Sequence, residues 1–250
     1  MVSTPDSAPP THPTPTLENT PMAHPEQAEF FSGVRAHYPH AFTGARVLEV
    51  GSLDINGSVR ELFTDCRYVG VDLQLAPGVD LACQGQLVEF PSGHFDTVIS
   101  AECMEHNPFW RETTANMLRM TRPGGLVLIS CATTGRLEHG TTRTNPDASP
   151  FTSAEAWDYY RNLSAADFEA SLYLKGWLAD WASWVNFITR DLYFVGLRHG
   201  AATELSAPMK QAFDSRYAMT ASAKAMRRGL KTKVFGDLLA TPRGKHRKAP

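Results

Sequence analysis

The chain has 250 residues, of which 42% are hydrophobic, and its formal net charge is −2. A chain of this length can bury a core without disulfides or structural metals. No apolar run approaches the roughly 18 residues that cross a bilayer, which excludes a membrane-spanning protein. The N-terminus has no basic start and no apolar stretch, so we do not expect a secretory signal. The four cysteines form no CxxC pair, and we expect a cytoplasmic protein.

The near-neutral total hides an uneven distribution of charge. Residues 208–250 carry eleven Lys and Arg against two acids, whereas the rest of the chain is acidic. An acidic body with a basic tail is not typical of a nucleic-acid-binding domain, so no nucleic-acid partner is favoured. We interpret residues 201–250 as a basic, partly helical C-terminal extension, with a helix between Ala218 and Leu239.

Residues 1–28 contain seven of the 17 prolines and few large apolar side chains. Such a segment cannot offset the entropy lost on ordering by burying surface, and we predict that it is disordered. The folded domain is expected to span residues 29–200. It should begin with a short helix that starts near Phe30 and ends before Pro39.

Strands and helices alternate through the folded domain. Short apolar runs and alternating patterns predict strands at 46–50, 68–72, 95–100, 126–130, 181–187 and 192–197. Helical spacing predicts helices at 58–63, 110–120 and 168–174. This alternation is typical of βαβ units and indicates an α/β fold whose parallel sheet is covered on both faces.

A long polar segment follows the strand at 126–130. Residues 133–150 are rich in Thr, Gly, Pro and Asn and show no periodicity. A loop of this length is typical of a lid or a binding loop. We therefore expect residues of about 133–160 to form a substrate loop that contains His139, with Tyr159, Tyr160 and Arg161 near its end.

Polar residues and glycines follow several predicted strands, at the sheet edge where α/β proteins bind ligands. Glu49 closes the first strand just before Gly51, which would let backbone approach a ligand, and its carboxylate could accept hydrogen bonds from an ammonium group. Asp72 ends the second strand, and an acid there can hold the two hydroxyls of a ribose. The remaining features of this kind are Gly85-Gln86, Ser100 to Glu102 and Glu105-His106.

The segments VLEVGS, YVGVD, FDTVIS, MEH and RPGG stand in the order and spacing of a known family. The chain resembles the class I S-adenosylmethionine-dependent methyltransferases, close to the group often called type 11. The resemblance covers about 42–130, and LYFVGL at 192–197 is similar to the family's last strand. It implies a Rossmann-like, doubly wound, mostly parallel seven-stranded sheet with an antiparallel last strand. It also implies S-adenosylmethionine as cofactor and S-adenosylhomocysteine as product.

The resemblance assigns roles to individual residues. Glu49 to Gly51 would face the methionine portion, Asp72 the ribose and Leu73 the adenine. Gly85 and Gln86 would lie near the adenine edge, and Ser100 and Glu102 next to the methyl group. The usual later glycines of the first loop are replaced, so that loop is expected to rely on its side chains. The predicted cofactor residues are Glu49, Gly51, Ser52, Asp54, Asn56, Asp72, Leu73, Gly85, Gln86, Ser100 and Glu102.

A nicotinamide-dependent dehydrogenase would also combine a glycine turn with a strand-end acid. It normally needs GxGxxG and a helix N-terminus facing a diphosphate. The segment after Gly51 lacks this pattern, and Asp54 would repel a diphosphate. S-adenosylmethionine carries no phosphate, so the sequence favours the methyl donor.

Of the predicted features, the group that accepts the methyl group is the one that the sequence determines least. A hydroxyl of a small molecule, such as a sugar or a natural-product scaffold, is our first interpretation, with His139 or His106 as the base because imidazole titrates near neutrality. His106 has a competing structural role at a helix start. The alternatives are an amine or carbon acceptor, or a non-catalytic binding or scaffold protein that keeps the cofactor fold.

Two further expectations concern metals and assembly. The histidines form no HxH or HxxxH pair and the cysteines have no zinc-type spacing, so no metal is expected. The aromatic cluster of Trp177, Trp181, Trp184 and Phe187 is interpreted as core or dimer packing rather than substrate stacking, which leaves a homodimer open.

Overall fold

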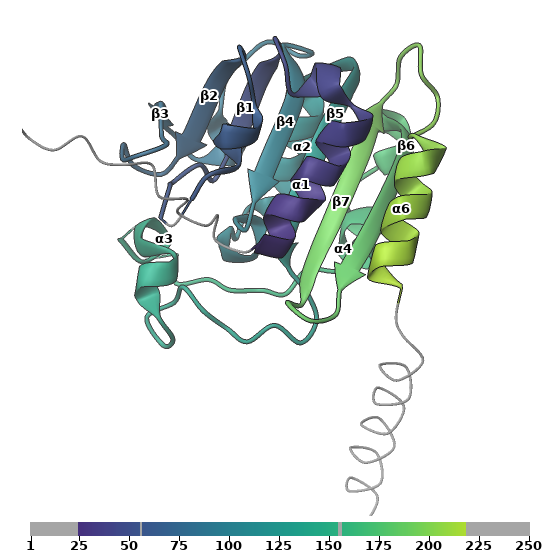
Figure 1. Cartoon of the computed structure of the whole chain (residues 1–250). Coiled ribbons are helices and arrows are strands. Elements are labelled where there is room, and N and C mark those ends of the chain that lie inside the picture. The colour runs from purple at the N-terminus through teal and green to yellow at the C-terminus, as the bar shows by residue number, and fades with distance from the viewer. Residues whose placement is uncertain (1–24, 56, 155–156, 219–250) are drawn as a thin grey trace, which may run out of the picture.

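The structure is a computed structural model that describes residues 25–55, 57–154 and 157–218. Its centre is a seven-stranded sheet in the order β3-β2-β1-β4-β5-β7-β6 (Figure 1). The strands are β1 Arg46–Val50, β2 Arg67–Asp72, β3 Leu81–Ala82, β4 Phe95–Ala101, β5 Thr121–Ala132, β6 Leu178–Asn186 and β7 Asp191–Arg198. Strands β1 to β5 pair in parallel, while β7 runs antiparallel to both β5 and β6. The predicted Rossmann-like fold with an antiparallel last strand is confirmed.

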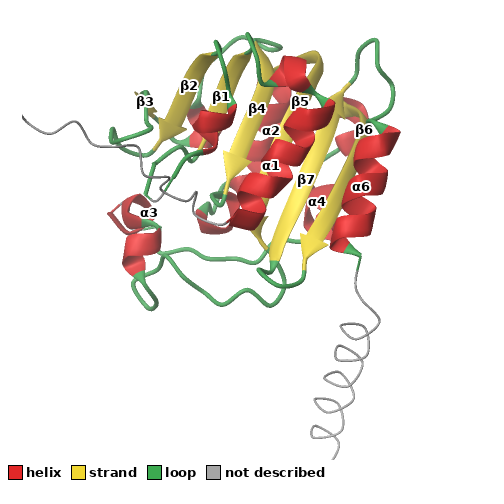
Figure 2. Ribbon diagram, in the orientation of Figure 1, coloured by secondary structure: helices red, strands yellow, loops and turns green. Residues whose placement is uncertain are grey.

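Helices cover both faces of this sheet. They are α1 Pro25–His37, α2 Trp110–Met120, α3 Pro150–Ala154, α4 Ala165–Ser171, α5 Leu174–Trp177 and α6 Ala207–Tyr217. Short 3-10 helices lie at Pro39–Ala41, Val59–Leu62, Gly85–Leu87, Met104–His106 and Pro146–Ala148. Figure 2 shows α1 and α6 on the near face of the yellow sheet and α2 and α4 on the far face.

The sheet separates two apolar cores. Leu48 of β1 packs with Trp110 of α2 and Phe168 of α4 on one face. Its neighbour Val47 belongs to the opposite core, which includes Phe30 of α1. Successive residues of a strand point to opposite faces, so a central strand buried on both sides must be apolar at nearly every position. Glu49 is the one polar residue among the four buried positions of β1, and it lies near the carboxyl end of the strand.

Helix α1 begins earlier than the sequence predicted. Pro25–Ala28, which we assigned to the disordered segment, form its first turn, and Pro25 provides a favourable helix start. The side chain of Gln27 is buried and its Nε2 donates to Ser130 Oγ at 2.8 Å, which anchors this turn on the sheet. The predicted boundary at residue 28 is therefore wrong, and residues 1–24 lie outside the described residues.

The remaining differences are local. The predicted helix at 168–174 is replaced by α4, which starts at a capping box on Ser164, and by the short α5. The predicted helix at 58–63 is a 3-10 helix over Val59–Leu62. Strand β3 has two residues and carried too little pattern to be predicted. Of the expected helix at 218–239, all but Ala218 lies outside the described residues, and α6 precedes it.

The tryptophans of the predicted aromatic cluster belong to the cores. Trp177 and Trp181 pack against the core on the α2 side, and Trp184 is buried on the α6 side. Trp184 Nε1 also donates to Asp214 Oδ1 of α6 at 2.8 Å. None of the helices described within residues 25–218 is both long and apolar enough to cross a membrane.

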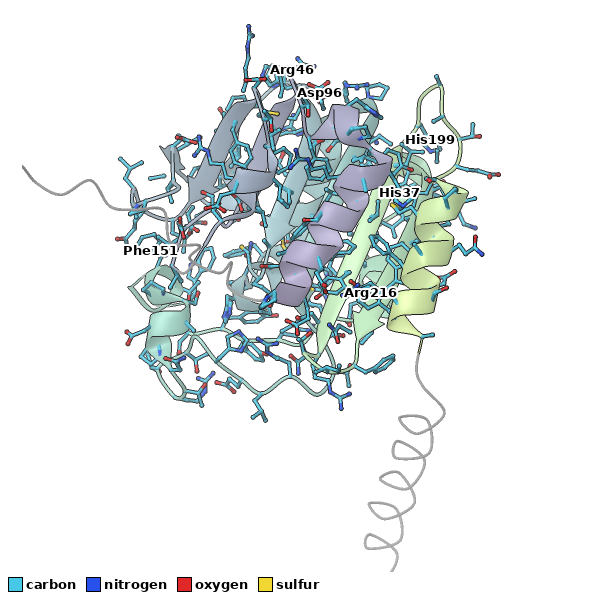
Figure 3. All side chains as sticks on the ribbon, in the orientation of Figure 1. His37, Arg46, Asp96, Phe151, His199 and Arg216 are labelled. Carbon is cyan, nitrogen blue, oxygen red and sulfur yellow. The ribbon has the colours of Figure 1, made fainter. Side chains whose placement is uncertain are left out.

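The topology brings the carboxyl ends of β1, β2 and β4 to one edge of the sheet. In Figure 1, α3 and the long loop after β5 lie at this edge. Figure 3 shows Phe151 of α3 at the same edge, whereas Arg46 and Asp96 meet at the opposite end of the sheet. Side chains from these strand ends and from the loop after β5 can therefore converge at the α3 edge.

Candidate active site

A cavity of about 500 Å³ opens at the carboxyl ends of the strands. Its wall includes seven of the predicted cofactor residues, namely Glu49, Gly51, Ser52, Asp72, Leu73, Gly85 and Glu102. Both predicted base candidates, His106 and His139, also line it. Three further predicted residues, Asp54, Gln86 and Ser100, are described but do not line the cavity. Asn56 lies outside the described residues.

Glu49 is a buried acid at the end of β1. Only 3% of the residue is exposed, and its Oε2 accepts a hydrogen bond from the Tyr68 hydroxyl at 2.8 Å. Burial raises the pKa of the Glu49 carboxyl to about 7, while the Tyr68 hydrogen bond opposes this shift. A buried carboxylate with so few partners is costly unless it meets a cation. This part of the cavity is therefore suited to a positively charged group.

The turn after Glu49 requires a glycine at position 51. Gly51 has a φ of +81°, and a Cβ atom there would lie 2.3 Å from the Cβ of Cys103. The N–H groups of Gly51 and Ser52 both donate to the carbonyl of Val71, at 2.8 and 3.1 Å. The turn is thus held on β2 by its own amides, and both residues line the cavity.

Asp72 presents a fixed carboxylate at the end of β2. Its Oδ1 accepts the N–H of Leu73 at 2.7 Å, and its Oδ2 accepts the N–H of Leu53 at 3.1 Å. Burial raises the pKa of Asp72 and these two amides lower it, with a net upward shift. Each oxygen keeps a further acceptor position, so the carboxylate can bind two neighbouring hydroxyls.

The three described residues outside the wall have contacts or positions of their own. Asp54 Oδ1 accepts the N–H of Gly57 at 2.8 Å and closes its own loop. Gln86 Nε2 donates to Gln84 Oε1 at 2.8 Å, so its amide faces a neighbouring side chain. Ser100 is fully buried within β4. Gly85 does line the cavity, and a Cβ atom there would lie 2.7 Å from Thr113 Cγ2.

Buried acids gather beside the middle of the cavity. Burial, together with Glu105 and Asp191, raises the pKa of Glu102 well above its usual range. Burial raises the pKa of Glu105 to about 7, although its Oε1 accepts the N–H of Ala132 at 3.1 Å. Asp191 forms an ion pair with Arg136 at 3.0 Å. Three buried carboxyl groups thus lie near the one guanidinium described in this region. Acidic groups therefore outnumber basic groups where little water can reach them.

Two histidines meet at the loop end of the cavity. The rings of His106 and His139 lie edge to face with centroids 5.0 Å apart, and both contact the ring of Tyr160. His106 is only 4% exposed, and burial lowers its pKa to about 3, with a further contribution from His139. His139 is half-buried, and its Nδ1 lies 3.0 Å from the carbonyl of Leu137. That contact requires a proton on Nδ1 and leaves the lone pair on Nε2.

A carboxylate, that of Glu105, lies close to the two histidines. One potential ligand atom from each of Glu105, His106 and His139 lies within 4.8 Å of the others. The spacing of the histidines along the sequence did not predict this cluster, because it forms only when the substrate loop folds back over the 3-10 helix Met104–His106.

Sequence reasoning missed much of the part of the cavity that the substrate loop lines. Gln27 lines the cavity but belongs to the segment predicted to be disordered. The substrate loop was predicted as a unit, and its wall residues are Arg136, Leu137, Glu138, Asn145, Ala148, Ser149, Pro150, Phe151, Thr152 and Trp157. Of the expected pocket residues after the loop, Tyr160 contacts the histidine rings and Arg161 pairs with Asp167.

The sheet order, the strand-end carboxylates and the cavity define a Rossmann-like methyltransferase architecture. The model of the family described as methyltransferase domain matches residues 22–190. The chain belongs to this family. It is a methyltransferase, and S-adenosylmethionine is its methyl donor, as expected for this family.

Solved structures with a similar fold share little sequence with the chain. Burkholderia thailandensis 1,6-didemethyltoxoflavin-N1-methyltransferase is 16% identical, with a TM-score of 0.49, covering 70% of this chain and 80% of that one. Haemonchus contortus phosphoethanolamine N-methyltransferase 2, solved with S-adenosyl-L-methionine, is 16% identical, with a TM-score of 0.48, covering 68% of this chain and 52% of that one. The [4+2]-cyclase SpnF is 11% identical, with a TM-score of 0.46, covering 70% and 81%. No curated protein sequence matches the chain.

Proposed function

We propose that the chain methylates a hydroxyl group of a small molecule, such as a sugar or a natural-product scaffold. The observation that carries this proposal is one cavity that is lined both by acids at the ends of β1 and β2 and by a histidine of the loop after β5, a strand that lies two places from β1 in the sheet. We call these two parts of the cavity the cofactor end and the acceptor end. Buried carboxylates of Glu49 and Asp72 stand at one end, and a half-buried imidazole of His139 stands at the other within a polar loop. The first end suits a cationic nucleoside, and the second suits an acceptor that must lose a proton.

The residues present fit S-adenosylmethionine. Glu49 would pair with the ammonium of its methionine portion, and Asp72 would accept hydrogen bonds from both ribose hydroxyls. Leu73 would lie against the adenine. Gly51 and Gly85 line the cavity, and each packs so closely against neighbouring side chains that a Cβ atom there would lie under 3.0 Å from one of them. Ser52 and Glu102 would complete the wall around the methionine portion, while Asp54, Gln86 and Ser100 lie outside it.

When bound, the cofactor supplies a methyl group on a sulfonium that is open to in-line displacement. The chain contributes position, exclusion of water and a base. His139 Nε2 carries a lone pair in the tautomer set by Leu137, so it would accept the proton of the acceptor hydroxyl. His106 is more deeply buried, and charging it would cost more desolvation. We therefore assign the base to His139 and an orienting role to His106.

A second candidate acceptor is an amine. The three buried carboxyls of Glu102, Glu105 and Asp191 outnumber the guanidinium of Arg136 and would favour a cationic substrate. An amine must lose its proton before it can attack, so the same base would serve it. The two candidate functions therefore differ in the chemical class of the acceptor, a hydroxyl or an amine, and not in the residue that acts as base.

The test is methyl transfer from radiolabelled S-adenosylmethionine to two matched panels. One panel holds sugars and phenolic scaffolds, and the other holds their amino analogues. We expect label in the hydroxyl panel, equimolar S-adenosylhomocysteine, and less product with the Asp72→Ala variant when the cofactor concentration is limiting. Label only in the amino panel would establish the second candidate. Binding of S-adenosylhomocysteine without transfer to either panel would contradict both.

A further inference from the structure

We propose that Glu105, His106 and His139 form a binding site for a divalent transition-metal ion such as Zn²⁺ at the acceptor end of the cavity. The three potential ligand atoms lie within 4.8 Å of one another. Ligands bonded to zinc at about 2.1 Å in a tetrahedral site are roughly 3.4 Å apart. His139 lies on an exposed loop, so small side-chain rotations can bring the three atoms to this spacing.

The buried nitrogen of His106 points to a ligand independently of that distance. Its Nδ1 is shielded from solvent and has no hydrogen-bond partner among the described residues. The backbone of Tyr159 also interacts with this side chain. A buried polar atom left without a partner is rare, and a metal ion would satisfy it.

Both histidines have the surroundings of metal-binding imidazoles. Such rings commonly donate their second nitrogen to a carbonyl or carboxylate, which orients the ring and places the lone pair on the first. His139 does this through Nδ1 and the carbonyl of Leu137. His106 also interacts with a backbone group, that of Tyr159. Gly140 allows the loop to cover the site, because a Cβ atom there would lie 3.0 Å from His106 Nδ1.

The charge around the site favours a dication. Glu105 adjoins Glu102 and Asp191, and Arg136 is the cation that forms an ion pair with this group, through Asp191. Two positive charges would offset the surplus of buried carboxyls. Two imidazoles and one carboxylate favour Zn²⁺ and similar ions over Mg²⁺ or Ca²⁺, which prefer all-oxygen sites. Because His106 and His139 line the cavity, a bound ion would keep a position open toward it.

Metal binding has a functional consequence that rests on the proposed function. The lone pair on His139 Nε2 cannot bind an ion and accept a proton at the same time. Zn²⁺ should therefore inhibit methyl transfer without displacing S-adenosylhomocysteine, whose predicted contacts lie at the other end of the cavity.

The experiment is calorimetric titration of untagged protein with Zn²⁺, supported by the visible absorption of bound Co²⁺. Wild type should bind one ion at this site, and His139→Ala should bind it at least about tenfold more weakly, since even second-shell changes cost that much. His199→Ala is the matched control, because Figure 3 shows His199 at the far end of the sheet. It should bind as wild type does. S-adenosylhomocysteine binding by each variant verifies the fold.

Equal Zn²⁺ affinity for wild type and folded His139→Ala would overturn the metal site, and so would the absence of stoichiometric binding to wild type. A second variant, Glu105→Gln, keeps the shape of the side chain and should also weaken binding. Zn²⁺ binding that depends on His139, in a protein that transfers no methyl group to either panel, would support the metal site while contradicting the proposed function. The two failures are therefore distinguishable.

Discussion

The two ends of the cavity are built in different ways. At the cofactor end, carboxylates sit on strand ends and are oriented by backbone amides, as Asp72 is by Leu53 and Leu73. At the acceptor end, the wall comes from a loop whose shape depends on exposed side chains. Arg143 holds that loop together through ion pairs with Glu138 at 2.8 Å and Asp158 at 3.0 Å. The first end follows from the fold, whereas the second depends on details that the fold does not constrain.

The largest expected effect is at the acceptor end. His139→Ala should slow methyl transfer by about 100-fold to 10,000-fold, the usual cost of losing a general base. Affinity for S-adenosylhomocysteine should stay unchanged, because His139 does not belong to the cofactor end. Single-turnover transfer, with binding measured in parallel, separates the two quantities. A rate within a few-fold of wild type would remove His139 as the base.

The Glu49 carboxylate should lower the free energy of unfolding of the cofactor-free protein at neutral and higher pH. Its pKa is raised from 4.5 to about 7 in the folded state, so the folded protein binds a proton that the unfolded chain has released, and stability falls as pH rises between these values. Glu49→Gln should therefore be more stable than wild type at pH 8 by about 3 kcal/mol, a difference that vanishes near pH 4. Urea unfolding at both pH values measures this.

The exposed residue Glu89 provides the control for that experiment. Glu89→Gln should show no such pH-dependent gain. Glu49→Gln should also bind S-adenosylhomocysteine more weakly than wild type, because an amide cannot pair with an ammonium group. Equal stability of Glu49→Gln and wild type at pH 8 would mean that the buried carboxylate is compensated, which would undermine its assignment to a cation.

The ribose contact is the next effect in size. Asp72→Ala should weaken S-adenosylhomocysteine binding by about 1.5–3 kcal/mol, the range for hydrogen bonds to a charged group. Asp147→Ala, in an exposed part of the substrate loop, is the comparison variant and should bind normally. Calorimetry gives both dissociation constants. An unchanged value for Asp72→Ala would exclude it from the site.

The smallest effect should come from the ion pairs of the substrate loop. The Arg143 side chain is 56% exposed, and exposed pairs contribute about 0–1 kcal/mol. Arg143→Ala should thus change the free energy of unfolding by less than about 1 kcal/mol and leave cofactor binding unchanged, while raising the KM for the acceptor. If S-adenosylhomocysteine affinity fell as well, the two ends of the cavity would not be independent.

The same contrast explains what the sequence could predict. Glu49 and Asp72 could be predicted from the sequence because each is a single acid at the end of an otherwise apolar strand. Acids are rarely buried, so an acid at such a position stands out. Asp54, Gln86 and Ser100 stand at similar positions, yet their side chains bond to neighbouring groups or lie inside the sheet. Sequence position near a strand end indicates where backbone approaches a ligand, but side-chain direction depends on local packing.

The acceptor end and the first helix were harder to predict for different reasons. The contact between His106 and His139 depends on how the substrate loop folds back, which no local pattern encodes. The start of α1 was hidden by the prolines around it, although burial of Phe30 and the anchoring of Gln27 on Ser130 stabilise its first turn. In both cases the deciding contacts join residues far apart in the chain.

The most direct test of the account is a crystal structure with bound S-adenosylhomocysteine. The account predicts both ribose hydroxyls at Asp72, the ammonium at Glu49 and the sulfur directed across the cavity toward His139. A cofactor bound elsewhere, or one whose sulfur faces away from the histidines, would contradict the claim that one cavity joins a donor end to an acceptor end.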